Sequence, residues 1–430
     1  MPKILAIIVT WNKKQYVLDL LTSLDNIDWP REQLDIVIVD NASEDGTVEA
    51  LKNEFPNIQL LCNEENLGGT GGFNTGLQWA FQQHGYDYLW LLDNDVVVHR
   101  SALKSLANTL DSRPDVAVAG SAMMQLDYPW RVNEIGAFFD QQTGRLNLNQ
   151  HLLEIPEWKN QSVQPLLETE ADLSKLLPDC PLHTEVDYVA AASLLIRAGV
   201  AKEAGLWRDY FIHFDDVDWC LRIRAMGHRV VACSQSLVWH LSAIAKIPTW
   251  VLYYDNRNVL DVLKTHGAGQ AVLKRLQRYI LKKAVYYHLI GKADLARLHH
   301  EALKDFRENR LGKKDIQLDT QYRAFTELVN LSAGKNVLIS WTTEQKVLGK
   351  VRNSMPGAHV TEQYKSAKSE WFWRFKRYDY VVQSDYKPSI MLAWLGTDCI
   401  YANHDGFCVR AQPRIWDIVK SVLLYAKGWL

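Results

Sequence analysis

Two aspartates stand directly after a run of apolar residues. Asp93 and Asp95 follow Tyr88–Leu92, and such an uninterrupted apolar run predicts a buried strand. Side chains two apart share one direction at an extended strand end, so both carboxylates can converge on one ion while Asn94 turns elsewhere. Two hard oxygen ligands in that position favour Mg²⁺ or Mn²⁺ carrying a diphosphate. The alternative is an ordinary turn and helix cap.

A second acidic cluster comprises Asp215, Asp216 and Asp218. It opens a segment with helical apolar periodicity that is expected to end near Gly227. The helix dipole favours acids in a first turn, so a plain helix start is one interpretation. Crowded carboxylates also repel one another, which raises the pKa of at least one and suits a general base. Both interpretations stay open.

His240 ends the next expected strand, Ser236–His240. A lone histidine is usually a satisfied core or surface residue. Because it follows two acidic clusters, His240 is also a candidate to complete a metal shell.

The segment 63–76 holds four glycines within five residues, and Asn66 and Asn74 lie on either side of them. Glycine permits close backbone approach, and amide groups at a helix start suit a diphosphate or sugar hydroxyls. The spacing matches neither a Rossmann fingerprint nor a Walker loop. A flexible surface loop is the alternative.

Asp40 ends another expected strand and is followed by the sequence NASEDGT. Ser43, Asp45 and Gly46 in that stretch are explained as turn and cap residues. Asp40 itself remains available to accept hydrogen bonds from a nucleobase.

Strands and helices alternate through the first 121 residues. Strands are expected at Ile4–Thr10, Asp35–Val39, Ile58–Cys62, Tyr86–Leu92 and Val116–Gly120, and helices at Tyr16–Leu24, Thr47–Phe55, Gly72–Gln82 and Ser101–Leu110. This order predicts an α/β fold with a parallel sheet covered on both faces. Ligands of such sheets bind beyond the carboxyl ends of the strands, where the polar residues above are found.

The pattern changes after Gly120. We expect a hairpin over Val132–Leu148, a long polar loop of the kind that often covers a site over Asn149–His183, and a strand over Val186–Arg197 followed by a helix near Val200. Residues 250–310 are expected to be helical. Their basic stretch, Lys264–Lys283, is either a solvated face or a contact for an anionic lipid-linked acceptor or membrane surface.

The carboxyl-terminal third shows a second alternation. Strands are expected at Asn336–Ser340, Gly357–Thr361, Tyr378–Gln383 and Thr397–Tyr401, with a final helix over Pro413–Leu430. The run WFWRFKR at Trp371–Arg377 and the apolar tail are candidates for membrane association or self-assembly, although core packing explains most such aromatic residues.

The composition excludes several classes of function. A net charge of −2 over 430 residues argues against nucleic-acid binding. The six cysteines include no CxxC pair, which is typical of a reduced, cytoplasmic protein. The amino terminus is expected to be a strand rather than a signal peptide, and no apolar run approaches the ~18 residues of a membrane span.

The motifs together resemble a known family. NLGGTGGFN, DND, FDDVD and VWH, in this order on an α/β chain, resemble inverting family 2 glycosyltransferases of the GT-A fold over residues 3 to about 262. Within the family, FIHFDDVDWCLR and YYDNRN are most similar to bacterial galactofuranosyltransferases. The resemblance implies metal-dependent transfer of a sugar, with UDP-galactofuranose favoured as donor, to a glycan or polyprenyl-diphosphate-linked acceptor. A dTDP-rhamnose-dependent enzyme of the same family is the alternative.

The resemblance also implies roles for single residues. Asp93, Asp95 and His240 would bind Mn²⁺ or Mg²⁺, and Asp216, beside Asp215, would be the catalytic base. The nucleotide-sugar donor would be held by Thr10, Asn12, Asp40, Asn66, Gly68, Gly69, Gly72, Asn74, Asp93 and Asn94. One departure leaves the acceptor open: where polymerising galactofuranosyltransferases carry a tandem tryptophan platform, Tyr188–Ser193 reads YVAAAS.

These expectations define three regions. Residues 1–262 would be the GT-A domain, 263–311 a helical region, and 312–430 a small α/β domain for acceptor binding, homo-oligomer assembly or membrane association at the inner face of the cell membrane. Two other functions are alternatives to a glycosyltransferase. A nucleotidyltransferase would lack a downstream acidic base motif, and a non-catalytic glycan-binding scaffold would leave the acids idle.

Overall fold

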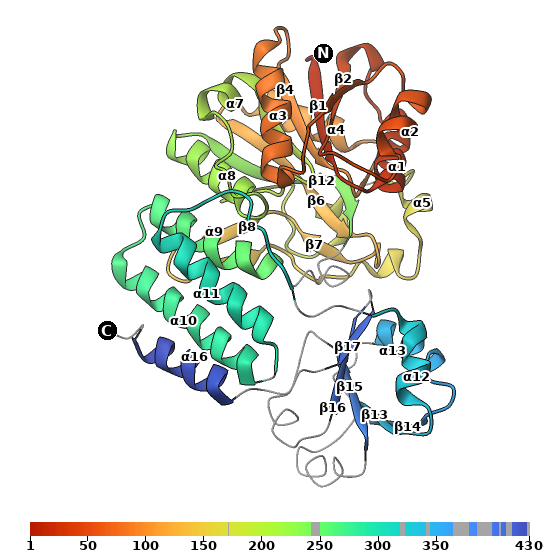
Figure 1. Ribbon diagram of the computed structural model, residues 1–430. Helices are drawn as coiled ribbons and strands as arrows, with labels where there is room; N and C mark the ends of the chain where they lie inside the picture. Colours follow the sequence, from red (N-terminus) through yellow and green to blue (C-terminus); the bar gives the residue numbers. More distant parts are fainter. Residues whose placement is uncertain are drawn as a thin grey trace. The chain divides into compact units, whose positions relative to one another are not determined.

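The computed structural model describes residues 1–170, 172–241, 250–289, 291–318, 323–340, 345–363, 378–384, 398–403, 406–409 and 415–427 (Figure 1). The chain forms two compact units. The first comprises Met1–Lys246, Asn258–Gly269 and Arg310–Lys313, and the second comprises Ile247–Arg257, Gln270–Asn309 and Lys314–Leu430. The domain limits expected from the sequence stay a prediction.

The first unit is built on a mixed sheet whose parallel part has the strand order β4-β1-β2-β3. Its strands are β1 (Ile4–Thr10), β2 (Leu34–Asp40), β3 (Gln59–Cys62) and β4 (Tyr88–Asp93), and the connecting helices are α1 (Lys14–Asp25), α2 (Thr47–Glu54) and α3 (Gly68–Gln82). Every residue of β1 is buried, as expected for a strand covered on both faces. The predicted alternation is confirmed, except that α3 begins at Gly68 rather than Gly72.

The rest of this sheet mixes strand directions. Strand β11 (Leu194–Arg197) runs antiparallel between β4 and β6 (Val116–Gln125), and β12 (Arg229–His240) lies parallel to β6. The short strands β5 (Val96–Val98) and β10 (His183–Val186) pair with β12, and β7 (Val132–Glu134) pairs with β6. The remaining elements of the unit are α4 (Ala102–Ser112), the hairpin β8 (Ala137–Asp140) and β9 (Arg145–Leu148), α5 (Val163–Leu166), α6 (Leu173–Leu176), α7 (Ala198–Ala204) and α8 (Asp215–Ala225).

Three predicted boundaries in this part are wrong. The stretch expected as one strand over 186–197 is the end of β10, a loop and then β11, because these two strands pair with different neighbours. Strand β12 begins at Arg229 instead of Ser236, since its first half pairs with β6 and β10. The expected hairpin is present, but it begins at Ala137 because Val132 belongs to β7 instead.

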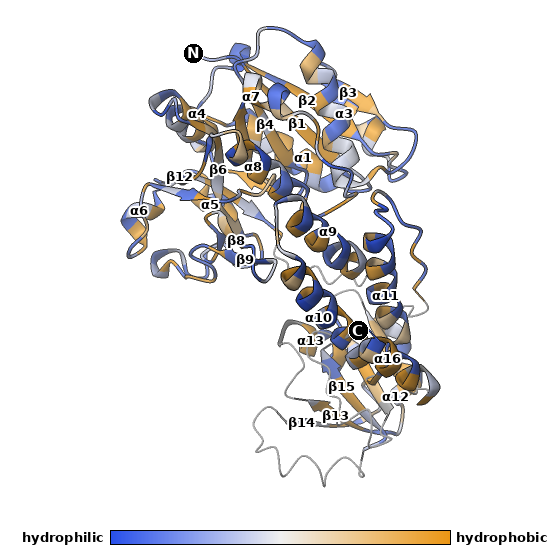
Figure 2. Ribbon diagram, turned by 90° about the vertical axis from the view of Figure 1, so that its left-hand side faces the viewer, coloured by the Kyte–Doolittle hydropathy of each residue, from blue (hydrophilic) through white to orange (hydrophobic). Residues whose placement is uncertain are grey.

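An apolar core fixes the strands of the first unit against the helices. Alternate residues of β4, Trp90 and Leu92, pack in one buried cluster with Leu20 of α1 and Leu106 of α4. The strands β1 and β2 show the orange of hydrophobic residues in Figure 2. Burying one such side chain contributes roughly 1.5–3 kcal/mol, so the position at which β4 ends is well determined.

The second unit contains a helical part and a small sheet. The helices are α10 (Gln270–Leu289), α11 (Ala293–Arg307), α16 (Ile415–Lys427), α12 (Leu328–Ser332) and α13 (Gln345–Asn353), while α9 (Val251–Thr265) has residues in both units. The sheet has the order β14-β13-β15-β16-β17, formed by β13 (Asn336–Ser340), β14 (His359–Gln363), β15 (Tyr380–Ser384), β16 (Asp398–Ala402) and β17 (Phe407–Val409). The expected α/β fold class, with helices and a second small sheet after the first, is confirmed.

Two expectations about the carboxyl-terminal third have different outcomes. The WFWRFKR run lies outside the described residues. Among the residues that are described, no helix combines the length and the apolarity needed to cross a bilayer.

Candidate functional site

The carboxyl ends of four neighbouring strands carry the polar residues that the sequence singles out. Thr10 of β1 lies level with Asp40 of β2, and Val9 lies level with Asp93 of β4. The chain moves outward from β1 to β2 and β3 on one side and continues with β4 on the other. The boundary between β1 and β4 is therefore a topological switch point, the place where sheets of this kind bind ligands.

Asp93, Asp95 and His240 converge at this edge. The Nε2 atom of His240 lies 2.9 Å from Asp95 Oδ1 and 3.8 Å from Asp93 Oδ2. The three side chains offer ligand atoms that all lie within 4.8 Å of one another. Strand pairing explains the meeting, because β5 follows Asp95 directly and pairs antiparallel with the end of β12, where His240 lies opposite Val96.

The donor set of this cluster fits a divalent cation. His240 Nε2 is buried and makes no hydrogen bond, although Asp95 Oδ1 is within 2.9 Å. A ring nitrogen close to carboxylates but without a well-aligned hydrogen bond is suited to donate its lone pair to a metal. Two carboxylates and one imidazole match Mn²⁺ or Mg²⁺ more closely than the thiolate sites of softer metals.

The residues beside this cluster form a polar floor at the ends of β1 and β2. Asn94 turns away from the two aspartates and donates from Nδ2 to Thr10 Oγ1 at 3.0 Å. Asn12 has a left-handed backbone with φ of +49°. It joins the loop after β1 to the loop after β2, because its Oδ1 accepts from the Glu44 amide at 2.7 Å. These contacts position the loops, and they engage the Thr10 and Asn12 side chains within the protein.

Asp40 differs from these neighbours. It is 1% exposed, and its Oδ2 accepts from the Ser43 amide at 2.9 Å. Its Oδ1 is buried without a hydrogen-bond partner. Leaving a buried carboxylate oxygen unsatisfied is costly, so this atom is a candidate acceptor for a ligand donor group.

The glycine-rich stretch is the first turn of α3, and most of its glycines have packing reasons. A Cβ at Gly72 would lie 2.3 Å from Val9 Cγ1, and one at Gly68, whose φ is +73°, would lie 2.1 Å from Phe211 O. A Cβ at Gly69 would meet nothing within 4 Å. Of the three predicted donor-binding glycines, Gly69 is therefore the one whose position leaves space beside the backbone.

The two asparagines of this motif are engaged locally. Asn66 Oδ1 accepts from the Gly68 amide at 2.8 Å and supports the start of α3. Asn74 uses both polar atoms on the Trp207 backbone, donating to its carbonyl at 2.9 Å and accepting from its amide at 2.8 Å. Asn74 is thus a structural residue here, and it holds the segment that leads into the second acidic cluster.

A strained segment presents that second cluster. Phe211, His213 and Phe214 all have left-handed backbones, with φ of +68°, +64° and +67°. Such conformations cost bulky residues roughly 1–2 kcal/mol each and persist where the surroundings hold them. Here Thr70 N donates to Phe211 O at 3.2 Å, and Asn258 Nδ2 donates to His213 O at 2.9 Å. These hydrogen bonds hold the strained segment and thereby fix the direction in which α8 starts.

Asp215 and Asp216 begin α8 side by side, and Asp215 is buried while Asp216 is half-buried. Asp215 Oδ2 accepts from Thr70 Oγ1 at 2.6 Å, while Asp216 Oδ2 accepts from the Ala191 amide at 3.3 Å. Burial raises the pKa of Asp215 above its usual range. Burial, with further repulsion from Asp215, raises the pKa of Asp216 to about 8. A carboxylate with a raised pKa is well matched to accept a proton near neutral pH.

Asp218 of the same cluster has another role. Burial alone would raise its pKa, but the hydrogen bond from His266 and the charge of Arg222 reverse the effect and lower it. Both partners lie 2.9 Å from its carboxylate oxygens. Asp218 is therefore an ionised structural residue that secures α8.

Glu134 of β7 was not singled out by the sequence, although it interacts electrostatically with His240 and with Asp216. It is 4% exposed, and Tyr188 OH is 3.4 Å from its Oε1. Burial raises the pKa of Glu134 to about 7, against the opposing effect of His240, and its charge also acts on Asp216. A weak signal existed: Glu134 has the same strand phase as the apolar Val132, so an acid stands where a core residue is expected.

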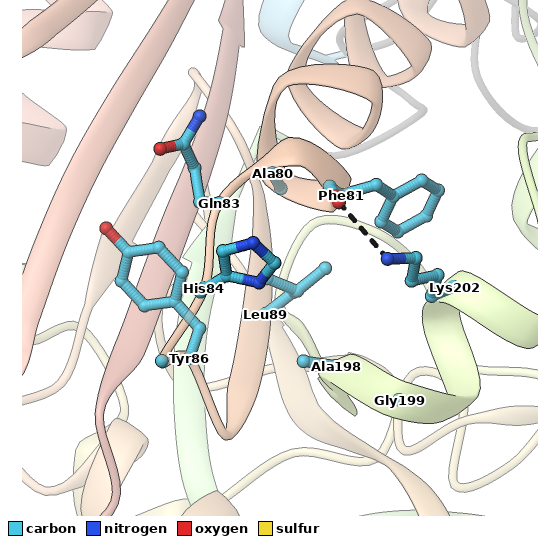
Figure 3. A pocket seen from close by; sticks show the side chains of 10 residues that line it. Ala80, Phe81, Gln83, His84, Tyr86, Leu89, Ala198, Gly199 and Lys202 are labelled. Carbon is cyan, nitrogen blue, oxygen red and sulfur yellow. Dashed lines mark hydrogen bonds between the residues drawn. The ribbon is translucent and has the colours of Figure 1, made fainter.

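One hollow lies elsewhere on the first unit. It has a volume of about 200 Å³ and is lined by the end of α3, the loop before β4 and the start of α7, including His84, Tyr86 and Lys202 (Figure 3). Lys202 Nζ donates to Phe81 O at 3.4 Å across it. The hollow adjoins the amino end of β4, whereas the acids gather at the carboxyl end, so it is separate from the candidate site.

A sheet edge with clustered acids beyond its carboxyl ends is typical of nucleotide-dependent enzymes. A family model described as "Glycosyltransferase like family 2" matches residues 2–258, and the chain therefore belongs to this family. The resemblance stated from the sequence is thereby confirmed at the level of the family.

Several proteins are similar to the chain. Galactofuranosyltransferase GlfT2 of Mycolicibacterium smegmatis is 24% identical over 313 residues, which cover 70% of this chain and 46% of that protein. GlfT2 of Mycobacterium tuberculosis is 25% identical over 250 residues, covering 57% and 38%. The chain thus spans less than half the length of these relatives. Among solved structures, Staphylococcus aureus TarS 1–349 in complex with UDP-GlcNAc has 16% identity and a TM-score of 0.44, covering 71% of this chain and 80% of that one.

Proposed function

We propose that this chain is an inverting glycosyltransferase that moves a sugar from a nucleotide donor to an acceptor hydroxyl at the carboxyl edge of its larger sheet. The observation that carries the proposal is the meeting of Asp93, Asp95 and His240, which come from two distant segments, at the switch point between β1 and β4. Family membership and the relatives named as glycosyltransferases support the same reaction class.

The donor is held through its nucleoside and its diphosphate. The buried, unsatisfied Oδ1 of Asp40 is proposed to accept from a nucleobase N–H, with Thr10 and Asn12 shaping the floor beside it. Asp93, Asp95 and His240 would hold Mn²⁺ or Mg²⁺, which supplies a Lewis acid for the charge on the leaving diphosphate. The open position at Gly69 lets the start of α3 approach the diphosphate or sugar.

Asp216 is proposed as the general base, with Asp215 beside it. Its carboxylate takes the proton of the acceptor hydroxyl while the acceptor oxygen bonds to the anomeric carbon. The bond from that carbon to the diphosphate oxygen breaks, and the nucleoside diphosphate leaves with the electron pair. Attack from the face opposite to the leaving group inverts the anomeric centre.

The favoured donor is UDP-galactofuranose, because two of the relatives are named galactofuranosyltransferases. Other relatives are named N-acetylglucosaminyltransferase and abequosyltransferase, so dTDP-rhamnose and further nucleotide sugars belong in the same test. The proposed acceptor is a glycan or polyprenyl-diphosphate-linked glycan. We further propose that residues 1–262 are the catalytic domain, in a protein located at the cytoplasmic face of the membrane, and that 263–311 and 312–430 serve acceptor binding or assembly.

The deciding experiment measures nucleoside diphosphate release from a panel of nucleotide sugars, with and without Mn²⁺ and a lipid-linked acceptor mixture. Release that requires metal and stops in Asp95→Asn supports the proposal. The matched control is Asp179→Asn, at an exposed aspartate with φ of +53° where asparagine is equally well tolerated. Binding of glycans without turnover of any donor would favour the non-catalytic scaffold instead.

A further inference from the structure

Helix α16 turns an apolar side toward solvent. Ile415, Val419, Val422 and Leu423 are exposed by 75%, 40%, 46% and 56%, and Trp416 by 81%. At about 100° per residue, these positions fall within one stripe of roughly 120°. A helix of a globular unit normally buries such a stripe against its core.

The opposite side of α16 is the one that contacts the protein. Ser421 is 1% exposed, and its hydroxyl lies 3.2 Å from His300 Nε2 of α11. Helix α16 also packs along α10 (Figure 1). The contacts of α16 with α10 and α11 therefore leave its apolar stripe on the outer side of the helix.

The neighbouring helix α10 is strongly basic. It contains five lysines and arginines and no acid between Gln270 and Leu289, and Lys274, Arg275, Lys282 and Lys283 are exposed. Lys283 also lies 5.7 Å from the ring centres of Tyr279 and Tyr286. Exposed cations beside amphipathic tyrosine rings are typical of surfaces that meet lipid headgroups.

We propose that α16 and α10 form a docking surface for an anionic lipid bilayer, with α16 lying in the plane of the interface. The apolar stripe enters the boundary between headgroups and acyl chains, while Lys420 and Lys427, both exposed on α16, border it and meet the anionic headgroups. The inference does not rest on the proposed transferase activity.

Charge favours a lipid surface over a second copy of this chain. An isologous contact through α16 would place Lys420 and Lys427 of both copies at one interface, beside two basic α10 helices. Like charges at such an interface oppose association, whereas anionic lipids neutralise them.

The test is co-sedimentation of the full chain with vesicles of phosphatidylcholine alone or mixed with phosphatidylglycerol. We expect binding to the anionic vesicles that weakens with added salt. Leu423→Asp should reduce vesicle binding roughly tenfold or more, since a charge replaces an apolar side chain that would enter the bilayer. Lys282→Glu and Lys283→Glu should each reduce it roughly fivefold or more, because each lysine near an anionic surface contributes about that factor.

Val329→Asp is the matched control, because Val329 is a 41% exposed apolar residue on α12 of the same unit and should leave vesicle binding unchanged. Circular dichroism and thermal unfolding of each variant show whether the fold is retained. Equal binding to neutral and anionic vesicles, or Leu423→Asp binding like the unmodified chain, overturns the proposal. If light scattering shows that the unmodified chain is a dimer and Leu423→Asp is not, and the unmodified chain binds no vesicles, the stripe is an interface with a second copy and the proposal is wrong.

Discussion

Replacing Asp216 by asparagine should stop sugar transfer while leaving donor binding intact. Asparagine has nearly the same size, and its one side-chain oxygen can keep the shorter of the two present contacts, in which the Val217 amide donates to Asp216 Oδ1 at 2.8 Å, while the Ala191 amide loses its contact with Oδ2 at 3.3 Å. It cannot take a proton. Loss of a positioned base lowers the rate by ~10²–10⁴, which corresponds to an increase of about 3–5 kcal/mol in the barrier.

The same substitution should not destabilise the protein. The pKa of Asp216 is raised in the folded state, mainly by burial and further by Asp215, whereas an unfolded aspartate has a pKa near 3.9. As pH rises between these two values, the unfolded chain loses its proton first, so this group lowers the free energy of unfolding across that window. Asparagine removes the effect, and above the window Asp216→Asn should be at least as stable as the unmodified chain.

Two measurements separate a catalytic from a structural role. Steady-state kinetics over a pH series should show a rate that increases through the raised pKa of Asp216 in the unmodified chain, and Asp216→Asn should lack this limb. Thermal unfolding and titration with nucleoside diphosphate should give unchanged or higher stability and unchanged donor affinity. Unaltered turnover would remove Asp216 from the mechanism, and lost stability together with lost donor affinity would make it a structural residue.

Four other substitutions test separate parts of the first unit. His240→Ala should raise the Mn²⁺ concentration needed for half-maximal donor turnover by roughly tenfold or more, which metal titration by calorimetry checks independently of activity. Gly72→Ala should destabilise by about 1–3 kcal/mol in chemical denaturation, since its Cβ would lie 2.3 Å from Val9 Cγ1, whereas Gly69→Ala should keep or raise stability and weaken donor binding only. Asp218→Asn should lower the free energy of unfolding by about 1–3 kcal/mol because it removes the buried charge that pairs with Arg222, and equal stability would contradict the structural role.

The parallel half of the sheet was predictable because β1 and β4 are uninterrupted apolar runs, β2 is apolar from Ile36 to Val39, and polar residues follow each of these strands. That pattern locates Thr10, Asp40 and Asp93 at one edge without any knowledge of tertiary contacts. The antiparallel half was harder. Strand β11 is four residues long and sits between β4 and β6, so its pairing depends on long-range contacts that leave no local periodicity.

The glycine-rich stretch shows a different limit of sequence interpretation. A missing side chain is needed both where a ligand approaches the backbone and where a helix packs tightly on a strand. Gly72 and Gly68 satisfy the second need, against Val9 and Phe211, and only the space around Gly69 admits the first. Likewise, the motif grouped Asn74 with the donor residues, while its actual partner, Trp207, lies far along the chain.

The three aspartates at the start of α8 show why partners, rather than spacing, decide the role of an acid. Asp218 is held by a hydrogen bond with His266 and the charge of Arg222, which lower its pKa against the effect of burial and occupy its carboxylate oxygens. Asp215 is fixed by the hydroxyl of Thr70. Asp216 accepts hydrogen bonds from the backbone amides of Ala191 and Val217, and burial together with the charges of Asp215 and Glu134 raises its pKa. Because Glu134 also interacts with His240, one buried acid of β7 is within electrostatic reach of a residue from each cluster.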